Sequence, residues 1–151
     1  MSPLKKITYI AILLLFTITL TGCANQDKTN EQTIFHINEV AEVGDTEIVL
    51  NDVYETKNWN DIERENDTYL IFEFRITNHS KSNLGINSGN NFKLIIDGIQ
   101  YPDMNNNSTA FVQQDKSMIY QVVYDVPEKD SYELTFVSGN DSIQFIYKLK
   151  H

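Results

Sequence analysis

The side chains that most often carry out chemistry in proteins are few and widely spaced in this chain of 151 residues. Cys23 is its single cysteine, and its three histidines are His36, His79 and His151. None of them has a second histidine at the four-residue spacing that places two zinc ligands on one helix face. The chain also lacks a Gly-x-Ser-x-Gly sequence and a glycine-rich loop that is followed by lysine. We therefore expect a protein that is not an enzyme and that holds no metal or other cofactor.

The acidic run from Asp61 to Asp67 is a candidate binding surface. Three of its carboxylates, those of Asp61, Glu63 and Glu65, occupy alternate positions, and oxygen ligands in such an arrangement can wrap around Ca²⁺. An EF-hand loop, however, also requires glycine at its sixth position and glutamate at its twelfth, and neither is present. Two other interpretations stay open, a solvated loop that keeps neighbouring strand edges from pairing and a surface for another ligand.

Trp59 is the second candidate for partner binding. It lies in Lys57-Asn58-Trp59-Asn60, among polar residues and outside any alternating pattern. Aromatic side chains on loops are enriched at recognition surfaces. The alternative is that Trp59 folds back to cover one end of the domain.

The first 22 residues are predicted to be a secretory signal peptide. Lys5 and Lys6 precede an apolar run over residues 7–20, which ends at small residues. The run is too short for a membrane span, which needs about 20 apolar residues. We expect cleavage between Gly22 and Cys23.

The sequence Leu20-Thr21-Gly22-Cys23 resembles the lipobox of bacterial lipoproteins. This resemblance implies that the Cys23 thiol is joined to diacylglycerol, with palmitate-like acyl chains, and that the protein is held on the extracytoplasmic face of the cell membrane. Two alternatives are an uncleaved N-terminal anchor and an ordinary secreted protein. Two acyl chains would hold such a protein stably, whereas one would not.

Composition narrows the class of partner. Removing Lys5 and Lys6 from the 12 basic residues leaves ten against 21 acidic ones, a net charge of −11. Nucleic-acid binding is not expected, because it requires clustered lysine and arginine. Residues 23–33 are polar and predict a flexible, lipid-anchored tether. Residues 34–151 then form one domain without an internal disulfide.

Apolar residues alternate with polar ones through most of this domain, which is the pattern of half-buried strands. The segment from Leu70 to Ile76 shows it most clearly, and Asp97-Gly98 suits a tight hairpin turn. A β-bulge is expected at Asn51-Asp52, where the alternation changes phase. Two long segments, 56–66 and 103–115, are expected to be irregular. Strands are predicted at residues 34–37, 46–54, 70–76, 92–96, 99–101, 118–126, 132–136 and 143–149.

About seven to eight short strands, with no segment of helical period, predict an all-β fold. An immunoglobulin-like β-sandwich is favoured over a closed barrel. The strand aromatics Phe72, Phe74, Tyr120 and Phe145 are expected to fill its core.

The order of several short motifs also resembles one known family. The motifs are Val43-Gly44-Asp45-Thr46, Ile76-Thr77-Asn78, Phe92-Lys93-Leu94 with Asp97-Gly98, Gln114-Asp115-Lys116-Ser117 and Tyr124-Asp125-Val126-Pro127. Over residues 34–150 this order is similar to the telokin-like, immunoglobulin-like domain of unknown function found on many bacterial lipoproteins. The resemblance implies an extracytoplasmic binding module and supplies no catalytic residues.

The sequence thus predicts a lipid-anchored, non-enzymatic binding module of the cell envelope. It contacts the membrane through diacylglycerol on Cys23, and its partner is an unidentified envelope protein or wall component. The alternatives are a solute- or ion-binding lipoprotein, with Ca²⁺ as one ligand, and an accessory domain of a transport or wall-processing system.

Overall fold

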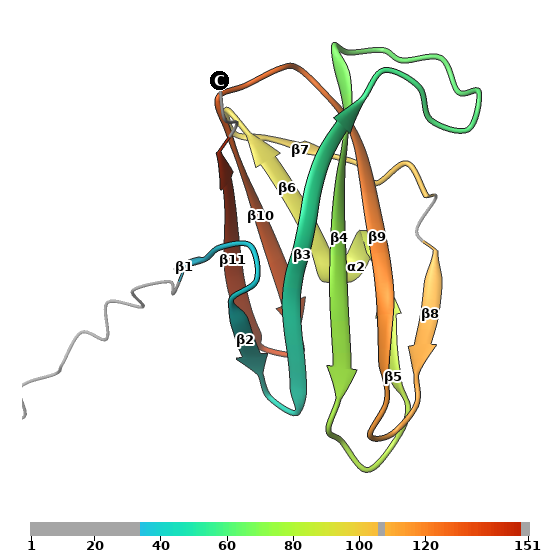
Figure 1. Cartoon of the computed structure of the whole chain (residues 1–151), viewed down its shortest axis with the longest axis vertical. Coiled ribbons are helices and arrows are strands. Elements are labelled where there is room, and N and C mark those ends of the chain that lie inside the picture. Colours follow the sequence, from blue (N-terminus) through green and yellow to red (C-terminus); the bar gives the residue numbers. More distant parts are fainter. Residues whose placement is uncertain (1–33, 106–107, 149–151) are drawn as a thin grey trace, which may run out of the picture. The chain divides into compact units, whose positions relative to one another are not determined.

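Alternating apolar and polar residues build two sheets that pack face to face in the computed structural model, which describes residues 34–105 and 108–148 (Figure 1). The four-stranded sheet has the order β2-β3-β4-β9, and the five-stranded sheet has the order β1-β11-β10-β6-β7. Strands β5 and β8 form a separate two-stranded ribbon. All pairs are antiparallel except β1 with β11. The predicted β-sandwich is therefore confirmed.

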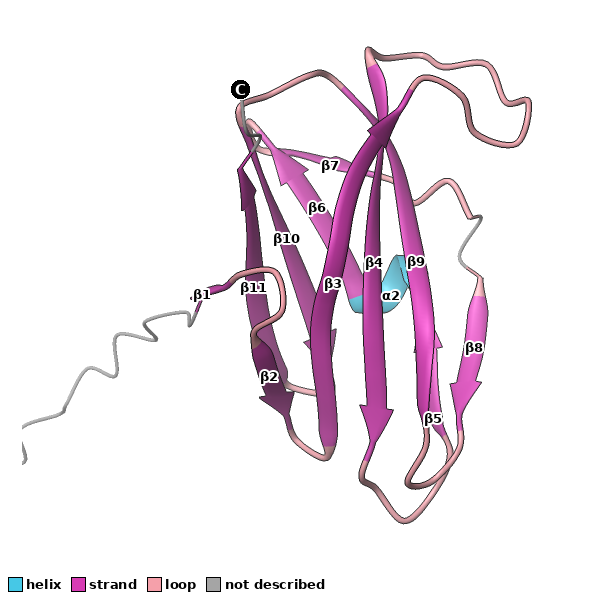
Figure 2. Ribbon diagram, viewed as in Figure 1, coloured by secondary structure: helices cyan, strands magenta, loops and turns pink. Residues whose placement is uncertain are grey.

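The described residues contain eleven strands and one single-turn helix, and Figure 2 shows how fully strands dominate. The elements are β1 (Ile34–Phe35), β2 (Val40–Val43), β3 (Thr46–Thr56), β4 (Thr68–Asn78), β5 (Leu84–Asn87), α2 (Ser88–Asn91), β6 (Phe92–Ile96), β7 (Ile99–Tyr101), β8 (Thr109–Val112), β9 (Ser117–Val126), β10 (Ser131–Ser138) and β11 (Asp141–Lys148).

The main core lies between the two sheets and is built from their inward-facing residues. Phe74 of β4 has its ring centroid 5.0 Å from that of Phe92 in β6 and 5.2 Å from that of Phe145 in β11. All three side chains are buried, and burying a phenylalanine contributes about 1.5–3 kcal/mol. Phe72 and Tyr120 are buried in the same core, so all four aromatic residues expected to fill it do so.

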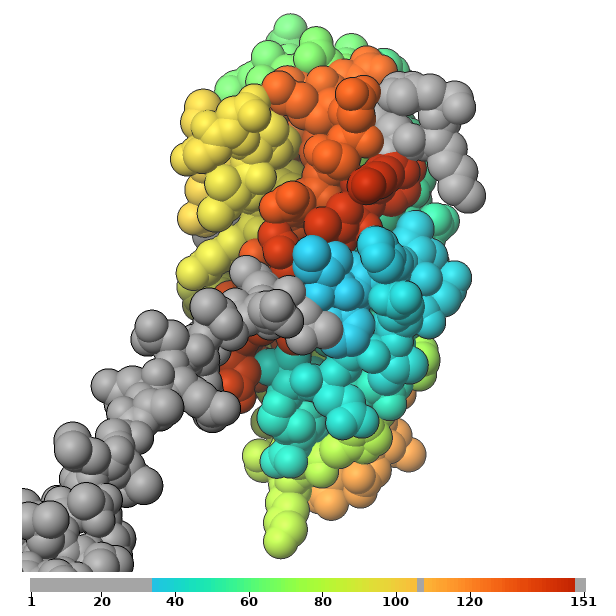
Figure 3. All heavy atoms as spheres, turned by 90° about the vertical axis from the view of Figure 1, so that its left-hand side faces the viewer, coloured from blue at the N-terminus to red at the C-terminus, as the bar shows by residue number. Residues whose placement is uncertain are grey.

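The two long edges of the sandwich are bridged differently. On one edge the chain passes from β1, which pairs with β11, to β2 in the opposite sheet, and Figure 3 shows β1 and β2 in blue and cyan beside the red of β11. On the other edge the chain leaves β7 and runs through residues 102–105 to the side of β9. The loop of residues 57–67 lies beside this second edge, where Trp59 and Met104 pack on the same cluster.

A second, smaller apolar cluster lies on the outer face of the four-stranded sheet. Tyr69, Ile71 and Val123 are buried there, and Trp59 and Met104 pack against them. The first half of β4 is therefore buried on both faces, whereas the sequence pattern predicts burial on one. The covering side chains come from loops, so strand periodicity could not reveal them.

Eight of the eleven strands coincide with predicted ones, within a few residues at their ends. The hairpin at Asp97-Gly98 is confirmed, with φ of 51° and 79° at its two residues. A bulge lies between Leu50 and Asp52, as expected.

Three strands were not predicted, so the expected seven to eight is too low. These are β2, β5 and β8, each of four residues. Strand β8 also corrects the prediction that 103–115 is wholly irregular. Four residues carry too few alternations to identify, and pairing with another strand, β3 for β2 and each other for β5 and β8, decides their conformation.

The predicted signal peptide, tether and lipidation site at Gly22 and Cys23 lie outside the described residues. Among the residues that the structure describes, no helix is long and apolar enough to cross a membrane.

Candidate functional site

The loop of residues 57–67 is held against the sandwich by a buried carboxylate. Asp125, near the end of β9, is only 7% exposed. Its carboxylate accepts the backbone N–H of Glu65 at 2.6 Å and that of Asn66 at 3.1 Å. The side-chain amide of Asn66 in turn donates to the backbone carbonyl of Asp125 at 3.2 Å. This arrangement satisfies the buried charge and fixes the second half of the loop.

Tyr69 fixes the first half of the same loop. Its hydroxyl donates to the carbonyl of Ile62 at 2.8 Å. Burial, and then the neighbouring Asp125 carboxylate, raise the pKa of Tyr69 above its ordinary value. The hydroxyl therefore keeps the proton that it donates.

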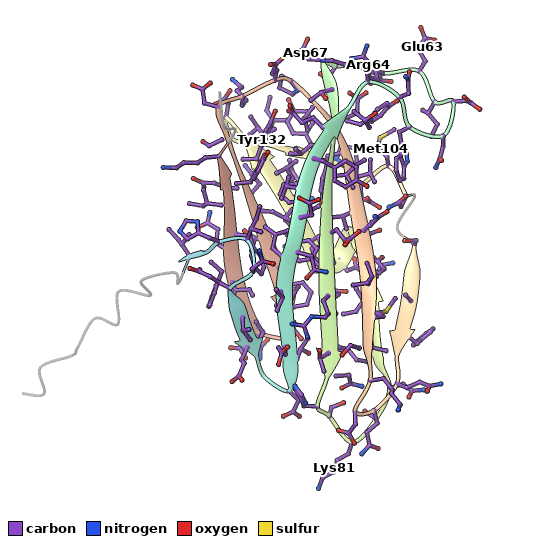
Figure 4. The ribbon with its side chains drawn as sticks, viewed as in Figure 1. Glu63, Arg64, Asp67, Lys81, Met104 and Tyr132 are labelled. Carbon is purple, nitrogen blue, oxygen red and sulfur yellow. The ribbon has the colours of Figure 1, made fainter. Side chains whose placement is uncertain are left out.

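The two basic side chains of the loop form hydrogen bonds inside the loop itself. Lys57 and Arg64 both donate to the backbone carbonyl of Asp67. None of the ion pairs among the described residues involves Asp61, Glu63 or Glu65. The loop therefore presents exposed carboxylates whose charge is not neutralised by its own basic residues (Figure 4).

Trp59 lies against the outer-face cluster and is partly buried. It folds back onto the sheet, although over the outer face rather than over the end of the sandwich. Its indole Nε1 is buried without a hydrogen-bond partner among the described atoms. This position favours a packing role for Trp59 over direct recognition.

Residues 103–105 form the facing wall by docking along the outer edge of β9. The Asp103 carboxylate accepts the N–H of Val123 at 2.9 Å, and the N–H of Met104 donates to the carbonyl of Val123 at 2.7 Å. The side chain of Asn105 donates to the carbonyl of Gln121 at 3.1 Å. These three hydrogen bonds occupy outward backbone groups of Val123 and Gln121 on β9, and they place Met104 beside the loop.

A pocket of about 390 Å³ opens between the two walls. We call it the loop-end pocket. Its apolar side is contributed by β7 and the segment after it, and its acidic side by the long loop. The lining residues are Ile62, Glu63, Glu65, Asn66, Ile99, Gln100, Tyr101, Pro102, Met104 and Asp125.

Sequence analysis identified part of this site. Glu63 and Glu65 line the pocket, whereas Trp59 and Asp61 do not. Asp125, Ile99 and Met104 were not singled out. Asp125 did carry a detectable signal, because a carboxylate near the end of an apolar strand must be satisfied by something.

Calcium binding receives no geometric support. Among the described residues, no group of three or more His, Cys, Asp or Glu side chains converges closely enough to hold a metal ion. Glu65 and its neighbours instead direct their backbone N–H groups at Asp125. The acidic run is a folded loop, and its carboxylates at Asp61, Glu63 and Glu65 are exposed.

Residues 35–144 match the family model described as a domain of unknown function, DUF4352. The chain belongs to the DUF4352 family. This places it among bacterial β-sandwich domains of unknown function, as the motif order suggested. No curated protein matches the chain.

Solved structures share the fold of this DUF4352 domain at low sequence identity. The ycdA protein of Bacillus subtilis, described as a candidate lipoprotein, is 18% identical with a TM-score of 0.59, and the match covers 72% of this chain but only 38% of that one. MPT63, a secreted protein from Mycobacterium tuberculosis, is 11% identical with a TM-score of 0.58, and the match covers 78% of this chain and 98% of that one. A β-sandwich protein from Clostridium difficile is 16% identical with a TM-score of 0.52, over 80% of this chain and 97% of that one. At these identities the likeness establishes the fold alone.

Proposed function

We propose that this chain is a non-enzymatic binding module, held on the outer face of the cell membrane by diacylglycerol on Cys23, and that its partner docks in the loop-end pocket. The anchor is supported by the lipobox-like sequence before Cys23. Its extracytoplasmic place is further supported by the descriptions of its structural neighbours, a candidate lipoprotein and a secreted protein.

The observation that carries the binding role is the preformed architecture of the pocket. Asp125 and Tyr69 hold one wall through partly buried hydrogen bonds, and Asp103 ties the other wall to β9. A partner that enters such a pocket does not have to order the loops, so little of its binding energy is lost. The lining combines exposed apolar side chains with carboxylates, which is the composition of a binding site.

The anchor is tested on the full-length protein in its bacterial host. Cys23→Ser should move the protein from the membrane fraction into the medium, while Thr29→Ser, in the tether, should leave it on the membrane. Mass spectrometry of the wild-type membrane form should show acylated Cys23 as the first residue. Retention of residues 1–22 would overturn the lipid anchor.

Docking in the pocket is tested by photo-crosslinking in intact cells. A benzoylphenylalanine at position 99, inside the pocket, should capture a defined partner. The same group at position 40 provides the control, because Val40 is 53% exposed and Ile99 is 60% exposed, but Val40 lies on β2 away from the pocket. Capture at position 99 should also disappear when Ile62 is changed to arginine. Equal capture at both positions, or turnover of a wall fragment that one point substitution abolishes, would contradict the proposal.

A further inference from the structure

The apolar side of the loop-end pocket, opposite the long loop, includes an open sheet edge. Strand β7 is the last strand of the five-stranded sheet and, among the strands that the structure describes, pairs only with β6. All three of its residues, and Pro102 after them, line the pocket. An exposed edge of this kind can accept an added strand.

The hairpin geometry identifies which backbone groups of β7 are free. Asp97 and Gly98 both have positive φ, so they form a two-residue turn that closes on the hydrogen-bonded pair Ile96 and Ile99. Bonded and non-bonded pairs then alternate, and Gln100 directs its N–H and C=O away from β6. No described residue bonds to these two groups, and Gln100 is exposed.

The edge of the other sheet, at β9, differs from that of β7 because its outward backbone groups beside the pocket already have partners. On β9 the corresponding outward groups of Val123 are already bonded to Asp103 and Met104. Pro102 has no N–H and therefore ends the pairing possible along β7. The unpaired backbone N–H and C=O of Gln100 therefore lie inside the pocket, and pairing cannot extend past Pro102.

The side chains around Gln100 define the chemistry of the occupant. Ile62 is 42% exposed and Ile99 is 60% exposed, so both offer apolar surface. Glu63 and Glu65, opposite β7, have no basic side chain paired with them among the described residues. An occupant that matches both features carries apolar and cationic side chains.

We infer that the loop-end pocket binds an extended peptide segment, in which basic and aliphatic residues alternate, as an added strand on β7. This inference rests on the proposed function and specifies its partner. The peptide backbone pairs with Gln100, its aliphatic side chains contact Ile62 and Ile99, and its lysine or arginine side chains lie near Glu63 and Glu65. The alternation follows from the period of two in a strand.

The test uses a fluorescein-labelled Lys-Val-Lys-Val-Lys peptide, with a Glu-Val-Glu-Val-Glu peptide for comparison. Fluorescence anisotropy with the full chain should show binding of the lysine peptide that weakens as salt is raised. The double variant E63Q/E65Q should weaken binding about tenfold, since each exposed ion pair contributes a modest amount. The control double variant E42Q/D141N removes two exposed carboxylates elsewhere and should bind as the wild type does.

The backbone contact is tested separately at Gln100. Q100P removes the free N–H without breaking any internal hydrogen bond, and proline is tolerated on an edge strand. Q100A keeps the N–H and is the reference, against which Q100P should bind roughly fivefold more weakly. A melting curve checks that both variants are folded.

Each failure has a distinct meaning. Equal binding of the lysine and glutamate peptides would overturn the cationic partner, and equal binding by Q100P and Q100A would overturn strand addition. If neither peptide binds while position 99 still captures a partner in cells, the proposed function stands and this inference is wrong. If position 99 captures nothing either, both are wrong.

Discussion

Two buried polar residues fix the two ends of the four-stranded sheet, and they do so with different chemistry. Asn78, at the end of β4, is fully buried, and Asp125, at the opposite end on β9, is 7% exposed. In Figure 4 these ends are marked by Lys81 on one side and by Glu63, Arg64 and Asp67 on the other.

Asn78 joins two loops to each other. Its side-chain amide donates to the carbonyls of Ser82 and Val112 at 2.7 and 2.9 Å, and its Oδ1 accepts the N–H of Ser80 at 2.9 Å. Its backbone also bonds to Lys116 and Asp115. A neutral amide is both donor and acceptor, so it can bind carbonyls and N–H groups from several segments at once.

Asp125 can only accept, and it therefore collects backbone N–H groups from one loop. The loop is fixed through its backbone, and the side chains of Glu63 and Glu65 face the pocket. The comparison teaches that an amide closes an end of the sandwich, whereas a carboxylate orients a loop and leaves its outer surface available.

The largest expected effect is at Asn78. Asn78→Ala removes three side-chain hydrogen bonds and leaves buried groups unsatisfied, so we expect a loss of about 3 kcal/mol in the free energy of unfolding. Urea denaturation measures it. Asn78→Asp retains the acceptor but loses both donors, and it should also be destabilising. A change below about 0.5 kcal/mol in both variants would contradict the role assigned to the amide.

The next effect is at Trp59, on the loop that Asp125 orients. Trp59→Ala should cost about 2 kcal/mol, less than a fully buried tryptophan, because the side chain is only partly buried. Unfolding measurements should be combined with peptide binding. Unchanged stability with lost binding would reverse the interpretation and make Trp59 a recognition residue.

Asp125→Asn is expected to have a smaller effect on stability, about 1–2 kcal/mol, since the amide oxygen still accepts one of the two N–H groups. Its effect on the loop should be larger than its effect on the fold. Hydrogen exchange should accelerate at the amides of Glu65 and Asn66 while the amides of β4 stay protected. Equal acceleration in the whole sheet would show that Asp125 supports the fold rather than the loop.

The smallest expected effect is the pH dependence of folding stability caused by Tyr132, which lies at the same end of the sandwich. Burial raises the pKa of Tyr132 to about 12, and its hydroxyl accepts the N–H of Lys129 and donates to the Pro127 carbonyl. Because the folded state favours the protonated hydroxyl, its contribution to stability is complete below pH 10 and is lost as the pH rises through about 12. Tyr132→Phe should therefore show a shallower fall in stability than the wild type over this range. If the melting temperatures of Tyr132→Phe and the wild type fall in parallel as the pH is raised, this role of Tyr132 is contradicted.

Much of this fold could be predicted from the sequence, because strand periodicity is local. Leu70 to Ile76 and Asp97-Gly98 each carry their own signal, and the structure agrees with both. Part of the candidate site could be predicted as well, since Glu63 and Glu65 belong to an acidic run that is visible in the sequence. Strands such as β5 and β8 could not, because four residues acquire a strand conformation only through their partner.

The sequence by itself determined the all-β class, most strand positions and the acidic character of the long loop, since these depend on residue type and spacing along the chain. It also predicted the lipid anchor at Cys23, which lies outside the described residues. Only the tertiary structure decided that Asp125, about 60 residues from the loop in sequence, would hold Glu65 and Asn66, and that the open edge of β7 would face them. The hydrogen bonds of Asp125 depend on the pairing of β4 with β9, which sets Tyr69 opposite Asp125, and the position of β7 depends on how the two sheets meet. No local pattern encodes either of these long-range arrangements.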